Sequence, residues 1–193
     1  GFGGSAILVN YGNSSYFQSL FGYLTPVLTS FESSYWIRCW HGASDGWDVT
    51  TTFHVQCKMK KPTVVLLRVG SYVFGGFSDQ YWTASEDTLT YAASSKAFLF
   101  SLYNKNGYQP FKVTVKNPPN AKALCGYAKF GPTFGSSSGY DLYISNDAST
   151  KLSYSRILNY HIPPGCSFNV FCTTYADTTH FYLSDIEVFY GTF

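Results

Sequence analysis

Two histidines, two aspartates and a cysteine lie close together in the sequence and could bind a metal ion. These residues are His41, Asp45, Asp48, His54 and Cys57. Imidazole, thiolate and carboxylate groups bind zinc, and carboxylates also bind calcium. The spacing matches neither HExxH nor CxxC, however, and the alternation over residues 49–57 predicts a strand with His54 and Cys57 on opposite faces. We therefore predict no metal site. A metal-dependent hydrolase centred on His41 and Asp45 stays as an alternative.

Three glycines around residues 70–76 raise the question of a phosphate-binding loop. Such a loop needs a lysine after its last glycine and a helix that follows, and the segment RVGSYVFGGFSDQYW offers neither. We interpret Gly75 and Gly76 as structural residues that let a strand bend or pack closely against another backbone.

Two carboxylates near the end of the chain could act as an acid–base pair. Asp185 and Glu187 share one face of the last predicted strand, which would suit glycoside hydrolysis. Arginines at 38 and 68 lie in apolar strands and need carboxylate partners, so we favour Glu187 or Asp141 for that structural role. No G-x-S-x-G elbow is present. The sequence therefore predicts no catalytic residue and no cofactor.

Tryptophans in predicted turns are the best candidates for contact with a ligand. Trp47 follows an Asp-Gly turn and Trp82 borders a polar stretch, so we expect both rings to be exposed and able to stack on a sugar or a protein. With His41 and Asp45 they form the predicted binding site. The other two tryptophans lie in a predicted strand and are expected in the core.

The elements that must position these residues are mostly strands. Tyr and Phe number 17 each and charged residues make up only 12% of the chain, a composition that favours β structure. We predict about ten strands, among them 34–41, 49–57, a doubly buried strand at 62–69, and 167–175, with a long loop at 78–95 and another at 131–139. One helix is expected over 14–28, giving a mostly-β sandwich or barrel.

Five cysteines and one sequon favour an oxidising compartment. Cys39–Cys57 is our first choice of disulfide, because two strands joined by a turn can place these residues side by side. A local bridge between Cys166 and Cys172 is also expected, with Cys125 as the rival partner. The sequon Asn13-Ser14-Ser15 is a candidate glycosylation site.

Charge and hydropathy exclude some partners. The formal net charge is +2 and no basic run exceeds two residues, so we expect no nucleic-acid partner. No stretch approaches the roughly 20 apolar residues of a transmembrane helix. The chain starts without methionine, which favours a processed or trimmed chain.

Several stretches occur in an order that resembles the TLDc domain family, over about residues 15–191. They are KPTVVLLRVGSYVFGGF, KAFLFSL, GPTFG, YDLYIS and DIEVFYG. The variant CWH…DGWD…FHxxC resembles secreted TLDc-like proteins of marine invertebrates. The resemblance implies a sandwich of two antiparallel sheets with a few short flanking helices, and it implies no established catalytic residues. Intracellular relatives are linked to oxidation resistance and to the vacuolar proton ATPase.

Together these observations predict one domain over residues 1–193 that acts by binding and not by catalysis. We expect a secreted protein, a defence protein or toxin, that acts on a cell-surface protein or glycan. The alternatives are a regulator of the intracellular oxidation-resistance or proton-ATPase type and a metal-dependent nuclease or glycosidase.

Overall fold

Two antiparallel sheets of six strands each form the protein, and short helices cover one of them. The computed structural model describes residues 1–29, 34–118, 122–136 and 138–193. The first sheet has the order β1 (Tyr35–His41), β12 (Asp185–Thr192), β2 (Thr63–Val69), β3 (Tyr72–Ser78), β5 (Phe98–Tyr103) and β6 (Phe111–Thr114). The second has the order β11 (His180–Phe181), β10 (Ser153–Ser155), β9 (Gly139–Tyr143), β8 (Thr133–Ser136), β7 (Lys122–Gly126) and β4 (Thr90–Ala93). The predicted two-sheet sandwich is confirmed.

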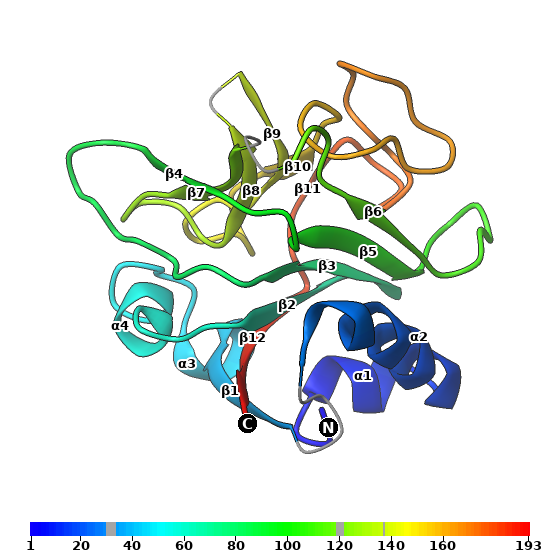
Figure 1. Cartoon of the computed structure of the whole chain (residues 1–193), viewed down its shortest axis with the longest axis horizontal. Coiled ribbons are helices and arrows are strands. Elements are labelled where there is room, and N and C mark those ends of the chain that lie inside the picture. The colour runs from blue at the N-terminus through cyan, green and yellow to red at the C-terminus, as the bar shows by residue number, and fades with distance from the viewer. Residues whose placement is uncertain (30–33, 119–121, 137) are drawn as a thin grey trace.

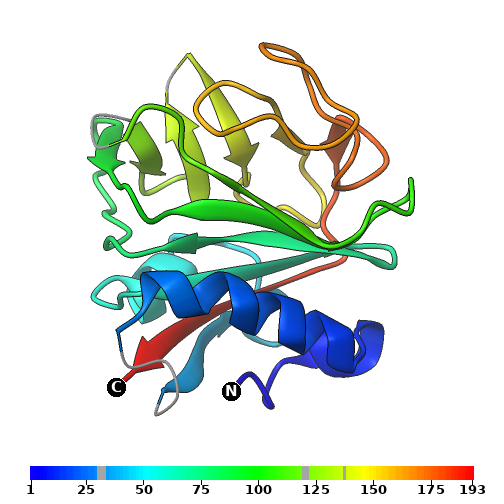
Figure 2. The same ribbon diagram turned by 45° about the vertical axis from the view of Figure 1, so that its right-hand side comes forward.

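The helices lie on the face of the first sheet that points away from the second sheet, or beside its β1 edge. They are α1 (Ala6–Tyr11), α2 (Ser14–Leu24), the 3-10 turn η1 (Thr25–Val27), α3 (Gly42–Asp45) and α4 (Phe53–Cys57). Figure 1 shows α1 and α2 beneath the first sheet and the second sheet above it, and Figure 2 shows α2 lying along the first sheet. Among the described residues, no helix is long and apolar enough to cross a membrane.

The central strand β2 is buried on both faces, as its continuous apolar run predicts. Val64 and Leu66 pack with the helices, whereas Val65 and Leu67 pack between the two sheets. A strand side chain points to alternate faces, so a strand with a layer on each side needs apolar residues at every position.

The predicted strand at 49–57 is wrong. Residues 53–57 form helix α4, and Asp48 organises the turn before it: its carboxylate accepts from the Thr50 N–H at 3.1 Å, and its carbonyl accepts from the Thr52 hydroxyl at 2.7 Å. Such local bonds from Asp and Thr compete with strand pairing. The alternation predicted a strand with Phe53, Val55 and Cys57 on one face, but helix α4 buries Phe53 and Cys57 and leaves Val55 68% exposed.

Other boundaries also differ from the predictions. The segment 167–175 is not a strand and pairs only through the isolated bridge between Arg156 and Phe171. The loops predicted at 78–95 and 131–139 contain β4 and β8, although position 137 lies outside the described residues. Helix α1 was not predicted. It is only six residues long and gives too little periodicity to recognise.

Candidate functional site

Trp82 is not exposed, so its predicted role in a surface site is wrong. Its side chain is 2% exposed, its indole N–H donates to Thr63 Oγ1 at 2.9 Å, and its ring packs edge-on against Phe134 at 5.3 Å. The stretch after β3 turns inward and places the indole between α4 and β8, where it fills the core and has a partner for its N–H. Trp47 is half-buried against the same core.

His41 and Asp45 lie together, but their polar groups are already engaged. His41 Nε2 lies 2.7 Å from Asp185 Oδ2, and its Nδ1 lies 2.9 Å from Ser44 Oγ. Asp45 accepts the backbone N–H of His41 at 2.8 Å. In the tautomer that satisfies both contacts, Nε2–H donates to Asp185 and Nδ1 accepts from Ser44. The cluster therefore ties the end of β1 to β12 and to α3.

The residues considered for a metal do not converge. Among residues 1–29, 34–118, 122–136 and 138–193, no group of three or more His, Cys, Asp or Glu side chains is arranged to hold an ion. His54 lies in α4 and contacts the Phe130 carbonyl through Nε2 at 2.6 Å, while Cys57 is bonded to Cys39.

The two carboxylates of β12 serve separate partners. Glu187 is fully buried and accepts from Arg38 Nη1 at 2.7 Å, from the Ser5 hydroxyl at 2.7 Å and from the Ile7 N–H at 2.9 Å. It therefore neutralises an arginine of β1 and binds free N–H groups at the start of α1. Asp185 faces His41, so the two carboxylates do not form an acid–base pair.

Both predicted disulfides are present, although one joins different elements from those expected. Cys39–Cys57 connects β1 to helix α4 and not to a second strand, and Cys166–Cys172 closes a short loop. Cys125 is a buried free thiol, and burial raises its pKa. Asn13 of the sequon is exposed and caps α2 by accepting the Ser15 N–H at 2.9 Å.

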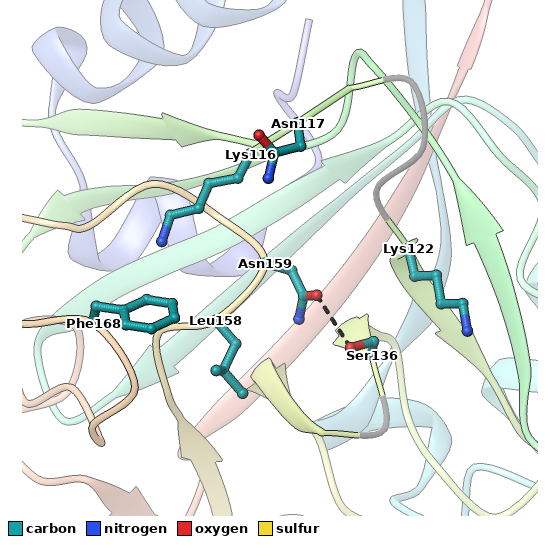
Figure 3. A pocket seen from close by; sticks show the side chains of 7 residues that line it. All are labelled: Lys116, Asn117, Lys122, Ser136, Leu158, Asn159 and Phe168. Atoms are coloured by element: carbon teal, nitrogen blue, oxygen red, sulfur yellow. Dashed lines mark hydrogen bonds between the residues drawn. The ribbon is translucent and has the colours of Figure 1, made fainter.

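A cavity of about 430 Å³ lies where β7 begins and β8 ends, away from the predicted site. Its lining comes from five separate segments, as Figure 3 shows: Lys116, Asn117, Lys122, Ser136, Leu158, Asn159 and Phe168. The volume is within the range of small-molecule sites. We call these seven residues the cationic pocket.

A buried carboxylate holds the backbone segment that carries Leu158 and Asn159 of the cationic pocket. Asp141 is fully buried and accepts the backbone N–H groups of Leu158 at 3.0 Å, Asn159 at 2.9 Å and Tyr160 at 3.0 Å. The Asn159 amide also donates to Asp141 at 2.9 Å and accepts from the Ser136 hydroxyl at 3.1 Å. Asp141 thus holds this backbone segment and pairs with no arginine, so of the two carboxylates favoured for that role only Glu187 has it.

The family model of the TLDc domain matches residues 12–191. The chain belongs to the TLDc family. The match covers nearly the whole chain, in agreement with the ordered motifs in the sequence. No curated protein matches the sequence of this TLDc protein.

The cationic pocket of this TLDc protein combines two charges with an apolar wall. The ammonium of Lys116 lies 4.3 Å from the centre of the Phe168 ring, and that of Lys122 lies 5.0 Å from the centre of the Tyr91 ring. Within the described part of the chain, neither lysine forms an ion pair, and the Asn117 amide makes no hydrogen bond. Two unpaired cations beside amide, hydroxyl and apolar groups suit a ligand with an anionic group on a partly apolar body.

Little in the sequence indicates this pocket. Its members lie up to about fifty positions apart in the chain, and none belongs to a recognised motif. The one local signal is the pair of lysines, 116 and 122, with two prolines between them in the sequence. Such a pair is common on protein surfaces, so only the folded chain shows that both line one cavity.

Proposed function

We propose that this TLDc protein is a secreted, non-enzymatic binding protein whose ligand is an anionic glycan of a cell surface, bearing sulfate or carboxylate groups. The observation that carries the proposal is the cationic pocket, where Lys116 and Lys122 have no carboxylate partner among the described residues and Phe168 lies beside Lys116. Lysine ammonium groups attract sulfate and carboxylate, and an aromatic face stacks on a sugar ring.

Two disulfides support the secreted part of the proposal. Cys39–Cys57 and Cys166–Cys172 are compatible with an oxidising compartment, where such bonds form and persist. A regulator of the intracellular type would work in a reducing environment. In a defence protein or toxin, the pocket would supply attachment to the target cell.

Binding to sulfated and non-sulfated oligosaccharides, measured by titration calorimetry, tests the proposal. We expect the double variant Lys116→Ala/Lys122→Ala to lose about tenfold or more in affinity for sulfated chains, since each lysine contributes a charge-assisted contact. The matched control is Lys58→Ala/Lys129→Ala, which removes the same charge from exposed positions outside the pocket.

The control variant should bind like the wild type, and affinity should fall as salt is added. Equal affinity of the pocket variant and the control variant for sulfated chains would exclude this pocket as the site. Absence of binding by the wild type to every anionic glycan would reject the glycan as ligand.

A further inference from the structure

The segment between β10 and β11 carries an unusual set of exposed apolar side chains. Ile162 is 46% exposed, Phe168 57%, Val170 45% and Phe171 40%. We call residues 162–172 the apolar loop. Figure 1 shows it in orange, projecting at the upper right beyond the second sheet and on the side opposite α1 and α2. Exposed apolar residues gathered at one projecting site mark a surface that contacts something less polar than water.

The apolar loop is held in its projecting form. The disulfide Cys166–Cys172 closes it, and the Asn169 N–H donates to the Ile157 carbonyl at 2.7 Å. The Ile157 N–H returns a bond to the Val170 carbonyl at 3.1 Å. The apolar loop is therefore ordered before any contact forms, so binding does not carry the entropic cost of ordering it.

Two cations lie against aromatic rings of the apolar loop, and the loop itself contains no carboxylate. Lys116 lies over the Phe168 ring at 4.3 Å. The Arg156 guanidinium lies over the Phe171 ring at 5.3 Å and donates to Asn169 at 3.0 Å. The sequence from 156 to 176 contains no Asp or Glu, and the next carboxylate, Asp177, is paired with Lys105 at 2.7 Å. A binding partner complementary to the loop would have an apolar interior and a negatively charged surface.

We propose that the apolar loop docks on an anionic lipid bilayer, with its apolar side chains in the interface and the basic side chains at the level of the phosphates. Aromatic and aliphatic side chains enter the headgroup region, while Lys and Arg extend to the anionic surface. A glycan explains this surface less well, because Ile162 and Val170 offer neither a flat ring nor a hydrogen bond. The proposal goes beyond the cationic pocket: neither Ile162 nor Val170 lines it.

Sedimentation with lipid vesicles tests the docking. The wild type is mixed with vesicles of phosphatidylcholine alone and with vesicles of phosphatidylcholine and phosphatidylserine. We expect binding to the second kind only. The variant Ile162→Ser/Val170→Ser should reduce the partition coefficient by about tenfold or more, since two apolar side chains no longer enter the interface. The variant Arg156→Gln should weaken the preference for phosphatidylserine.

The control is Val55→Ser/Met59→Ser, the same kind of change at side chains 68% and 69% exposed elsewhere on the molecule. It should bind like the wild type, and unfolding curves should show that both serine variants are folded. The proposal is overturned if the wild type does not bind vesicles that contain phosphatidylserine, or if the loop variant and the control variant bind them equally. If the wild type binds cells but no vesicle, and the loop variant loses that cell binding, the loop contacts a protein partner and the bilayer is equally rejected.

The same variants separate this proposal from the glycan function. The loop variant should keep its affinity for sulfated chains. If it loses only vesicle binding, that loss is assigned to the apolar loop and not to the cationic pocket. If sulfated chains fail to bind the wild type while vesicles bind, the glycan proposal fails and the docking surface stands.

Discussion

At the scale of single residues, burial decides what each polar side chain can do. His54 is 6% exposed, its Nε2 contacts the Phe130 carbonyl, and its Nδ1 has no partner within the described residues. Burial disfavours the charged imidazolium and lowers the pKa of His54 below its usual value, despite the contact with the carbonyl. This histidine is therefore a neutral structural group and a poor general acid.

The lowered pKa of His54 predicts a pH dependence of stability. In the unfolded chain the imidazole has its usual pKa of about 6.5, so the unfolded state takes up a proton first as the pH falls. The contribution of His54 to stability is therefore complete above about pH 6.5 and declines as the pH falls from there towards the folded pKa. Urea unfolding at several pH values should show that the free energy of unfolding falls less steeply with decreasing pH in His54→Gln than in the wild type. The control His161→Gln, at an exposed site, should keep the wild-type slope, and equal slopes in the two variants would contradict the assignment.

At the scale of elements, covalent and polar ties attach the short helices to the sandwich. Helix α4 has five residues, too few to be stable in isolation, and the Cys39–Cys57 bond fixes it to β1. Helix α1 has six residues and begins on the Glu187 carboxylate. These ties show why the local periodicity could not identify either helix: their stability comes from contacts with distant residues.

The two disulfides should differ in how much they stabilise the fold. A cross-link constrains the unfolded chain more when it closes a longer loop, and the sequence separations are 18 and 6 residues. We expect Cys39→Ala/Cys57→Ala to lower the free energy of unfolding by about 3 kcal/mol and Cys166→Ala/Cys172→Ala by about 2 kcal/mol. Denaturant unfolding of both double variants checks the order, and a larger loss for the 166/172 variant would contradict it.

At the scale of the whole molecule, two adjacent glycines allow β3 to pack closely against its neighbours. A Cβ atom on Gly76 would lie 2.4 Å from the Phe134 ring of the second sheet, whereas one on Gly75 would lie 1.9 Å from the Val65 carbonyl oxygen. These short distances agree with the structural role predicted for the two glycines. They lie in the middle of β3, where Gly76 allows the second sheet to pack closely and Gly75 allows the backbone of the neighbouring strand β2 to approach.

The contact of Gly76 with Phe134 predicts a steric cost. Gly76→Ala should lower the free energy of unfolding by about 1–3 kcal/mol, as in other overpacked cores. Adding Phe134→Leu should recover part of that loss, because the smaller side chain makes room for the methyl group. The control is Gly22→Ala in helix α2, where no atom lies within 4 Å of the new Cβ, and this change should stabilise by about 0.5–1 kcal/mol. A harmless Gly76→Ala would mean that the sheets adjust to the extra methyl group.

The predictions that were confirmed depend on sequence signals within short stretches of the chain. Apolar residues at 64–67 predicted a strand buried on both faces, and the positions of the cysteines suggested the two disulfides, since both signals are read within short stretches. The ordered motifs likewise indicated the TLDc family. By contrast, the alternation over 49–57 predicted a strand with Phe53, Val55 and Cys57 on one face, and only the folded chain shows a helix that buries the first and last of these and exposes Val55.

The sequence by itself therefore determined the fold class and the family, whose signals are carried by periodicity and by motifs along the chain, and it suggested the cysteine pairs without excluding Cys125. Only the tertiary structure decided that Trp82 fills the core, that Lys116 and Lys122 line one cavity with Phe168, and that the apolar loop projects between cations. The physical reason is that a pocket or a docking surface depends on which segments meet. Residues far apart in the chain are brought together by packing of the sheets, and no local pattern records that contact.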